Sequence, residues 1–209
     1  VKNILIGMDV DGGYGVMAGY RLATGDRLLS EMWEPHQTSA IFTACLIRLW
    51  LFLTGGRTDF LDLFLKGTFF IIHALITLFV YRTFQKDSRL AVLFALIFYV
   101  TSPKSIFIPE YSNLHLWFFT LLSMIFVRYY RERNTKKRLS YLVVAGFFLT
   151  ADVLAYPSMA LLLPFCLFMI SKSCAKQSWK KCLQRMGKEL GAFLLPCLIS
   201  ALIFFGYIQ

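Results

Sequence analysis

Charge is scarce in this chain of 209 residues, and negative charge is the scarcer kind. Charged residues make up 16% of the sequence, whereas an average soluble domain has about 25%. Only 12 acidic residues stand beside 22 basic ones, which gives a net charge of +10. Apolar residues instead make up 57% of the chain. This composition excludes an ordinary soluble domain, and the long apolar runs predict an all-α, polytopic membrane protein.

Cysteines are few, and the common nucleotide and metal motifs are missing. The five cysteines form an odd number without C-x-x-C spacing, so they predict neither a disulfide framework nor a zinc site. The sequence contains no P-loop, no G-x-G-x-x-G and no H-E-x-x-H motif, and it therefore indicates no cofactor and no metal. The basic residues lie in short loops and form no single patch, which disfavours nucleic-acid binding.

The apolar runs predict about six transmembrane helices within residues 67–208. A helix needs about 20 residues to cross a hydrocarbon core of roughly 30 Å. Pro157 separates two of the runs, and because proline cannot continue the preceding helix, this pair is expected to form a tight helical hairpin. The runs lie at residues 38–54, 67–84, 90–106, 113–130, 139–155, 157–171 and 190–208.

Basic residues orient these helices in the membrane. The loops at 82–89, 128–138 and 172–188 hold 15 of the 22 basic residues. The positive-inside rule places all three loops in the cytoplasm. The loop at 102–112 and the turn at Pro157 then lie outside. The compact loops favour the plasma (inner) membrane of a bacterium.

Segment 39–53 is expected to be a juxtamembrane helix that lies on the outer surface. As a helix it is only about 22 Å long, and it carries Arg48 in its middle. Its large apolar residues share one helical face. A helix that crosses the membrane is the alternative. The apolar face comprises Ile41, Phe42, Cys45, Leu46, Leu49, Trp50 and Leu53.

With this choice, most acidic residues lie on the outer side. Residues 9–66 form one extracytoplasmic loop with seven acids, and Glu110 and Asp152 face the same side. Acidic residues contribute little to orientation, so a functional site explains their clustering better than topology does. Asp152, near the outer end of its helix, is expected to reach water and is not assigned to the site.

The segment "DVDGGYGVMAGYRLATGD" has a characteristic spacing. Asp11, Tyr14, Ala18, Arg21 and Gly25 lie at offsets 0, 3, 7, 10 and 14. This spacing resembles the first-loop motif of the GT-C glycosyltransferases, which include protein O-mannosyltransferases and lipid A aminoarabinose transferases. Enzymes of that family take sugars from polyprenyl-phosphate carriers. Without the resemblance, a segment so rich in Asp and Gly would be interpreted as a turn.

Two later segments extend the resemblance to a GT-C-like helix bundle. "WEPHQTSA" (33–40) occupies the place of the family's acidic, proline-bearing stretch before its juxtamembrane helix. "PEYSNLHLWFF" (109–119) occupies the place of the second acidic loop. Two positions depart from the family pattern. Gly12 replaces the usual Glu, and Asn113 replaces the usual Asp, with Glu110 three residues earlier.

The resemblance implies an inverting sugar transfer at the outer face of the membrane. A carboxylate takes a proton from the acceptor as polyprenyl phosphate departs; Asp11 is the expected base, Asp9 the alternative, and Glu110 a further catalytic carboxylate. The donor is a lipid-linked sugar, the acceptor an unspecified glycan, lipid or protein, and a divalent metal is conceivable but not indicated. The expected substrate-binding residues are Tyr14, Arg21, Glu34, His36, Gln37, Tyr111 and Asn113.

Structural roles remain open for several of these residues. Arg21 suits phosphate binding and equally an exposed position on a helix. His36 also fits a solvated loop, and Asn113 fits the N-cap of a helix. His73 lies in the middle of an apolar run, where a buried hydrogen bond between helices is the preferred interpretation and a functional role the alternative.

Two other functions compete with a transferase. A membrane transporter or lipid flippase would share the apolar runs and basic loops, but it should place polar residues near mid-membrane in broken helices. A non-catalytic scaffold is the third interpretation. The chain is expected to be an N-terminal piece of a longer enzyme, preceded by a further membrane helix and inactive alone.

Overall fold

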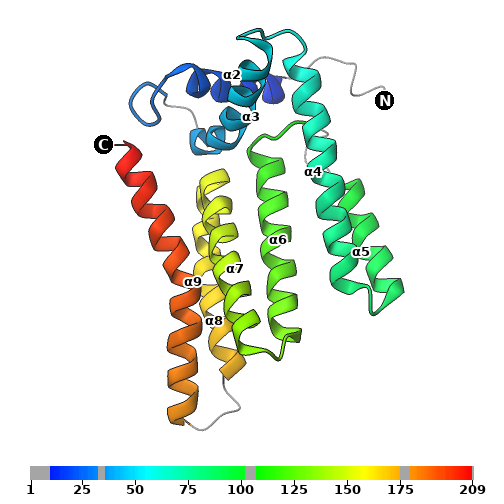
Figure 1. Cartoon of the computed structure of the whole chain (residues 1–209), viewed down its shortest axis with the longest axis vertical. Coiled ribbons are helices and arrows are strands. Elements are labelled where there is room, and N and C mark those ends of the chain that lie inside the picture. The colour runs from blue at the N-terminus through cyan, green and yellow to red at the C-terminus, as the bar shows by residue number, and fades with distance from the viewer. Residues whose placement is uncertain (1–9, 33–35, 102–106, 175–178, 209) are drawn as a thin grey trace. The chain divides into compact units, whose positions relative to one another are not determined.

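The computed structural model of the protein describes residues 10–32, 36–101, 107–174 and 179–208 (Figure 1). Helices make up 85% of the structure, and the described residues hold no strand, only an isolated bridge between Leu28 and Met32. The chain is therefore an all-α membrane protein, as its composition predicts. The described helices that are long and apolar enough to cross a membrane are Gln37–Thr54, Leu61–Phe84, Thr135–Ala155 and Cys182–Tyr207.

The chain divides into two compact units, Val1–Trp117 and Phe118–Gln209. The described helices of the first unit are α2 (Val10–Thr24), η1 (Gln37–Ser39), α3 (Ala40–Thr54), α4 (Leu61–Phe84), α5 (Ser88–Val100) and the start of α6 (Tyr111–Arg131). Those of the second unit are the rest of α6, then α7 (Thr135–Ala155), η3 (Pro157–Leu161), α8 (Leu162–Cys174) and α9 (Trp179–Ile208).

In the first unit, α2 packs closely against α3. A Cβ atom added to Gly19 of α2 would lie 2.9 Å from Thr43 Cβ of α3, so the two backbones approach as near as a glycine allows. The buried side of α3 carries the small residues Ala40, Thr43 and Ala44. Small residues at the contact and large residues outside are typical of helices that meet lipid. The exposed side of α3 carries Leu49, Phe52 and Leu53.

The helices α4 and α5 form a hairpin that encloses His73. Asp87 is the N-cap of α5, where its side chain accepts a backbone N–H of the first turn. His73 Nε2 donates to the carbonyl oxygens of Phe98 and Tyr99, both at 3.2 Å. Its Nδ1 accepts a hydrogen bond of 3.1 Å from the Trp117 indole. The buried hydrogen bond between helices that the sequence predicts for His73 is confirmed.

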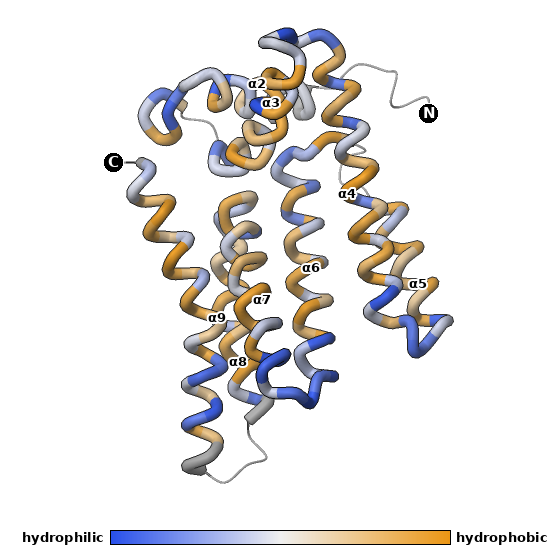
Figure 2. Tube along the Cα trace, viewed as in Figure 1, coloured by the Kyte–Doolittle hydropathy of each residue, from blue (hydrophilic) through white to orange (hydrophobic). Residues whose placement is uncertain are grey.

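The second unit contains the break predicted at Pro157, but α7 and α8 pack mainly against α9 and not against each other as a tight hairpin would. The helix α7 stops just before Pro157, and the short 3-10 helix η3 leads into α8. The helix α9 packs along α7 at Gly146, where an added Cβ would lie 2.6 Å from Pro196 Cγ and would clash with a backbone carbonyl. Figure 2 shows hydrophilic residues at the α6–α7 turn and in the first half of α9, with apolar residues along the remaining helices of this unit.

Asp152 does not reach water, and that expectation was wrong. Its exposed fraction is 0%. It continues the buried stripe of α7 that contains Leu142, Ala145 and Leu149. These residues recur at intervals of three or four, which is the spacing of one helical face. The position of Asp152 on that face, and not its distance from the helix end, determines its burial.

Candidate active site at the start of α6

A buried carboxylate lies directly before α6. Glu110 is only 2% exposed. Its Oε1 accepts hydrogen bonds of 3.1 Å from the backbone N–H groups of Ser112 and Asn113. Glu110 is therefore the residue that caps α6, in the position where a helix stabilises a negative charge best. The carboxylate is fixed in place by its own helix.

Asn113 does not cap the helix, and this prediction was wrong in position. It lies within the first turn of α6 and is completely buried. Its Nδ2 donates a hydrogen bond of 2.9 Å to the Ile108 carbonyl. Glu110 and Asn113 together thus tie the segment before α6 to the first turn of the helix. The helix begins at Tyr111, so Glu110 is the residue placed to cap it, and Asn113 lies too far along the first turn.

The helix α2 approaches Glu110 through a glycine. A Cβ atom added to Gly15 would lie 3.0 Å from Glu110 Cβ, so any larger residue would displace one of the two segments. From α3, Thr43 Oγ1 donates a buried hydrogen bond of 2.6 Å to the Pro109 carbonyl. Gly15, Gly19 and Thr43 thus join α2 and α3 to the start of α6. The G-x-x-x-G spacing of the two glycines was the sequence signal for this contact.

An aromatic pair lies next to the buried carboxylate. The rings of His36 and Tyr111 stack with their centroids 4.4 Å apart and their planes at 11°. His36 adopts a left-handed backbone conformation, with φ of 59°, which is uncommon for a residue other than glycine. Because Tyr111 directly follows Glu110, the stack brings His36 to the same end of α6. Four of the residues predicted for the site therefore meet there: His36, Glu110, Tyr111 and Asn113.

Two other predicted residues, Arg21 and Gln37, form hydrogen bonds with the loop at residues 25–32. Arg21 forms a 2.6 Å ion pair with Asp26, and its Nη2 donates to the Glu31 carbonyl at 2.8 Å. Gln37 Oε1 accepts a 2.9 Å hydrogen bond from the Leu29 N–H. Arg21 and Gln37 thus brace residues 25–32. Arg21 lies six residues after Gly15, about 9 Å farther along the helix. It is therefore distant from the contact of α2 with Glu110.

The structure describes the remaining predicted residues only in part. Asp9 and Glu34 lie outside the described residues, and the side chain of Asp11 does too. In its backbone position Asp11 belongs to the first turn of α2, four residues before Gly15. One helical turn separates the two, so they share a face of α2. Tyr14 is 39% exposed.

The arrangement holds a buried carboxylate in a fixed position beside an aromatic pair. Glu110 supplies acceptor oxygens at a helix start, and the His36–Tyr111 pair supplies a flat aromatic surface of the kind that packs against a sugar ring or another apolar face. Among the described residues, no group of three or more His, Cys, Asp or Glu side chains is placed to hold a metal ion.

A second buried acid, Glu189 of α9, was not expected from the sequence. It is 1% exposed and accepts a 2.6 Å hydrogen bond from the Tyr129 hydroxyl. Its Oε1 also pairs with Arg138 at 3.3 Å and with Arg185 at 3.0 Å. The guanidinium of Arg138 lies 4.2 Å from the centre of the Tyr129 ring. Glu189 therefore links α6, α7 and α9, and its surroundings give it a structural role.

Comparison with protein-family models, with curated proteins and with solved structures finds no match to this chain. What the site does must therefore be inferred from its own residues.

Proposed function

We propose that this chain belongs to a membrane glycosyltransferase of the GT-C type, which moves a sugar from a polyprenyl-phosphate donor to an acceptor outside the cytoplasm. The observation that carries the proposal is the buried Glu110 carboxylate. It is fixed at the start of α6 and packed against Gly15 of α2. The helix α2 also carries Asp11, Tyr14, Ala18 and Arg21 of the spacing that resembles the family motif, and Gly25 directly follows it.

In the proposed reaction, a hydroxyl or amine of the acceptor attacks the anomeric carbon of the donor. The new bond to that carbon forms as the carbon–oxygen bond to phosphate breaks, and polyprenyl phosphate leaves with the electron pair. The proton of the acceptor passes to Asp11 as general base, with Asp9 as the alternative. Glu110 accepts a hydrogen bond from a sugar or acceptor hydroxyl and holds it in the attacking geometry.

The aromatic pair next to Glu110 supports a sugar site. In the proposal, the His36–Tyr111 stack provides an apolar face for the ring of the transferred sugar. Arg21 and Gln37, which brace residues 25–32, position the loop that covers the departing phosphate. The proposal thus uses the predicted residues in two groups, one at the reacting carbon and one at the loop.

The rival interpretation, a transporter or flippase, relied on polar residues at mid-membrane. His73 is the clearest of them, and its ring is engaged by two carbonyls and the Trp117 indole. That set of partners gives His73 a structural role, so His73 itself gives no support to transport. We therefore propose the transferase first and keep transport as the alternative.

The test uses the full-length protein in vesicles that contain native polyprenyl-linked sugars, with loss of the sugar–lipid followed by mass spectrometry. For Asp11→Asn we expect a loss of about 100-fold or more, because general-base catalysis contributes at least that much. For Glu110→Gln we expect about a tenfold loss, the value of a hydrogen bond to a charged group. Asp59→Asn, which alters an exposed acid of the same region, is the matched control and should keep full activity.

Equal consumption by the wild type and all three variants would contradict these roles for Asp11 and Glu110. If the wild type consumes no sugar–lipid although acceptors of all three classes are present, the transferase proposal fails and transport becomes the better interpretation.

A further inference from the structure

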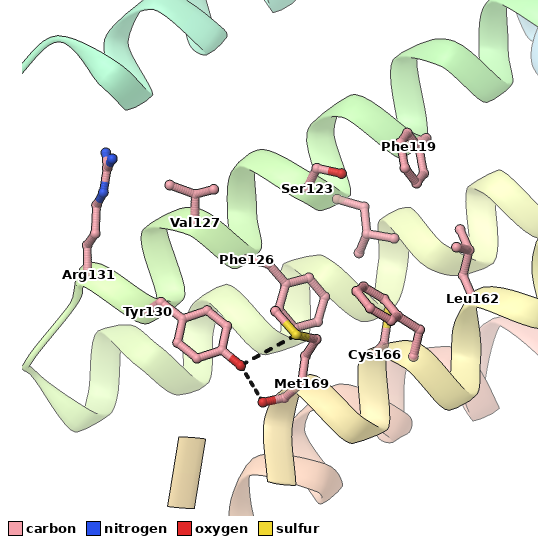
Figure 3. Close-up of a pocket in the computed structure, with 11 residues that line it drawn as sticks. Phe119, Ser123, Phe126, Val127, Tyr130, Arg131, Leu162, Cys166 and Met169 are labelled. Carbon is pink, nitrogen blue, oxygen red and sulfur yellow. Dashed lines mark hydrogen bonds between the residues drawn. The ribbon is translucent and has the colours of Figure 1, made fainter. Parts of the chain in front are cut away.

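An apolar groove runs between α6 and α8 in the second unit (Figure 3). It has a volume of about 370 Å³, which lies within the range of ligand pockets, roughly 300–1,000 Å³. Aromatic and aliphatic side chains form nearly all of its lining, among them Phe119, Phe126, Phe165 and Met169. The proposed reaction uses none of these residues.

The groove is open on one side and firm at its base. Phe119 and Phe165 are 41% and 59% exposed, whereas Phe126 and Cys166 are buried. The Tyr130 hydroxyl donates to the Met169 carbonyl and also lies 3.9 Å from its sulfur. This contact, drawn in Figure 3, joins α6 to α8 near the end of the groove.

The groove has the length of about half a bilayer. Its lining along α6 extends from Phe119 to Arg131, which is about 18 Å at 1.5 Å per residue. One leaflet of a hydrocarbon core of roughly 30 Å is about 15 Å deep. The α6 side of the groove thus matches the apolar depth of one leaflet, whereas its α8 side, from Leu162 to Met169, is about 10 Å long.

Positive charge gathers at one end of this groove. Arg131 lies in the last turn of α6 and is the one cation among the lining residues that the structure describes. It belongs to segment 128–138, in which Glu132 is the single acid. Basic residues at a helix end beside an apolar pocket are typical of sites for anionic lipid headgroups. The cations of this segment are Arg128, Arg131, Arg133, Lys136, Lys137 and Arg138.

We propose that this groove binds an anionic glycerophospholipid of the leaflet next to the basic loops. One acyl chain lies along Phe119, Phe126 and Met169, and the phosphate pairs with Arg131. A protein helix fits less well as the occupant. An apolar helix face would make no use of the cation at the end of the lining, whereas a lipid phosphate pairs with it.

The test uses the full-length protein in phosphatidylcholine vesicles with a minor fraction of phosphatidylglycerol that carries a photoactivatable diazirine in mid-chain. After illumination, we expect lipid adducts on peptides that contain Phe126 and Met169. Arg131→Gln should lower the adduct yield about fivefold, the contribution of one cation near a membrane surface. Arg133→Gln removes the same charge from the same loop outside the groove lining, and should keep the yield within twofold.

A second variant tests the groove itself. Ser123 lines the groove and is small, so Ser123→Trp should fill it and abolish the adducts; Ser123→Leu serves if the larger residue prevents folding. The proposal is overturned if diazirine-labelled phosphatidylcholine gives the same yield, or if Arg131→Gln and Arg133→Gln behave alike. It is also overturned if filling the groove changes nothing, or if adducts are absent because protein covers this face.

Discussion

Two glycines of α2 differ in what one added methyl group would meet. A Cβ on Gly19 would lie 2.9 Å from Thr43 of α3, whereas a Cβ on Gly13 would meet nothing within 4 Å. We expect Gly19→Ala to destabilise the protein by about 1–3 kcal/mol, because the two helices must move apart. Gly13→Ala should instead stabilise it by about 0.5–1 kcal/mol, since alanine favours a helix.

Thermal unfolding of the two variants in detergent checks this prediction. The midpoint should fall for Gly19→Ala and should stay level or rise for Gly13→Ala. Equal midpoints would mean that α2 and α3 do not approach as closely as the structure indicates.

Single residues were the hardest level to predict from the sequence. The polar start of α6 was recognised and an N-cap role was left open for Asn113, whereas Glu110 is the cap. Both side chains suit capping, and a shift of three residues in the helix start exchanges their roles. Glycines in 9–26 suggested a turn or a loop, whereas Gly15 and Gly19 serve helix packing. Composition alone cannot tell a glycine that makes a turn from one that lets two helices pack closely. The G-x-x-x-G spacing of Gly15 and Gly19 does indicate helix packing.

At the scale of the helices, Glu189 is the main polar link in the second unit. It joins Tyr129 of α6, Arg138 of α7 and Arg185 of its own helix. We expect Glu189→Gln to destabilise the protein by about 3–5 kcal/mol, because it leaves a largely buried arginine without its countercharge. Glu132→Gln, at the same end of α6, should have little effect on stability.

The free energy of unfolding in detergent, measured for both variants with a mild denaturant, checks this prediction. If Glu189→Gln unfolds like the wild type, the ion pairs do not hold the helices together, and packing at Gly146 would account for the contact of α7 with α9.

The elements themselves were largely predictable. The break at Pro157 and the helix near 39–53 follow from proline chemistry and apolar periodicity, and the structure has both. The buried face of each helix was harder to predict from the sequence. Asp152 was placed by its distance from the helix end, although Leu142, Ala145 and Leu149 already indicated its face. The pairing of α2 with α3 depends on contacts between separate segments, which a single sequence indicates only weakly.

At the scale of the whole molecule, the side of the membrane on which α2 lies decides whether the proposed site can act on an outer substrate. Length and apolar composition alone would let Gln37–Thr54 cross a membrane. The contacts of α3 within the first unit favour a surface position instead. Thr43, near its start, bonds to Pro109, and Ile47 packs with Ile108 and with Leu61, where α4 begins. The first half of α3 is thus connected to residues just before α6.

The polar contacts of α3 favour the same position. The guanidinium of Arg48 donates to the carbonyls of Leu22 and Ala23 at 3.1 and 3.3 Å, and a cation is favourable at the C-terminal end of α2. If α3 crossed the membrane, this pair would lie inside the hydrocarbon, together with the end of a helix that carries Arg21. Intramembrane charge of that kind is costly. A helix in the interface keeps both groups near water.

We therefore predict that both ends of α3 face the outside. In a variant without native cysteines, Ser39→Cys and Asp59→Cys should both react with a membrane-impermeant maleimide added to intact cells. Lys137→Cys, in the basic loop, should react only after permeabilisation and serves as the control. If Ser39→Cys also required permeabilisation, α3 would cross the membrane and α2 would lie on the side of the basic loops. Asp11 could then not meet a sugar donor outside the cytoplasm, so this one labelling pattern would refute the proposed transferase before any substrate is known.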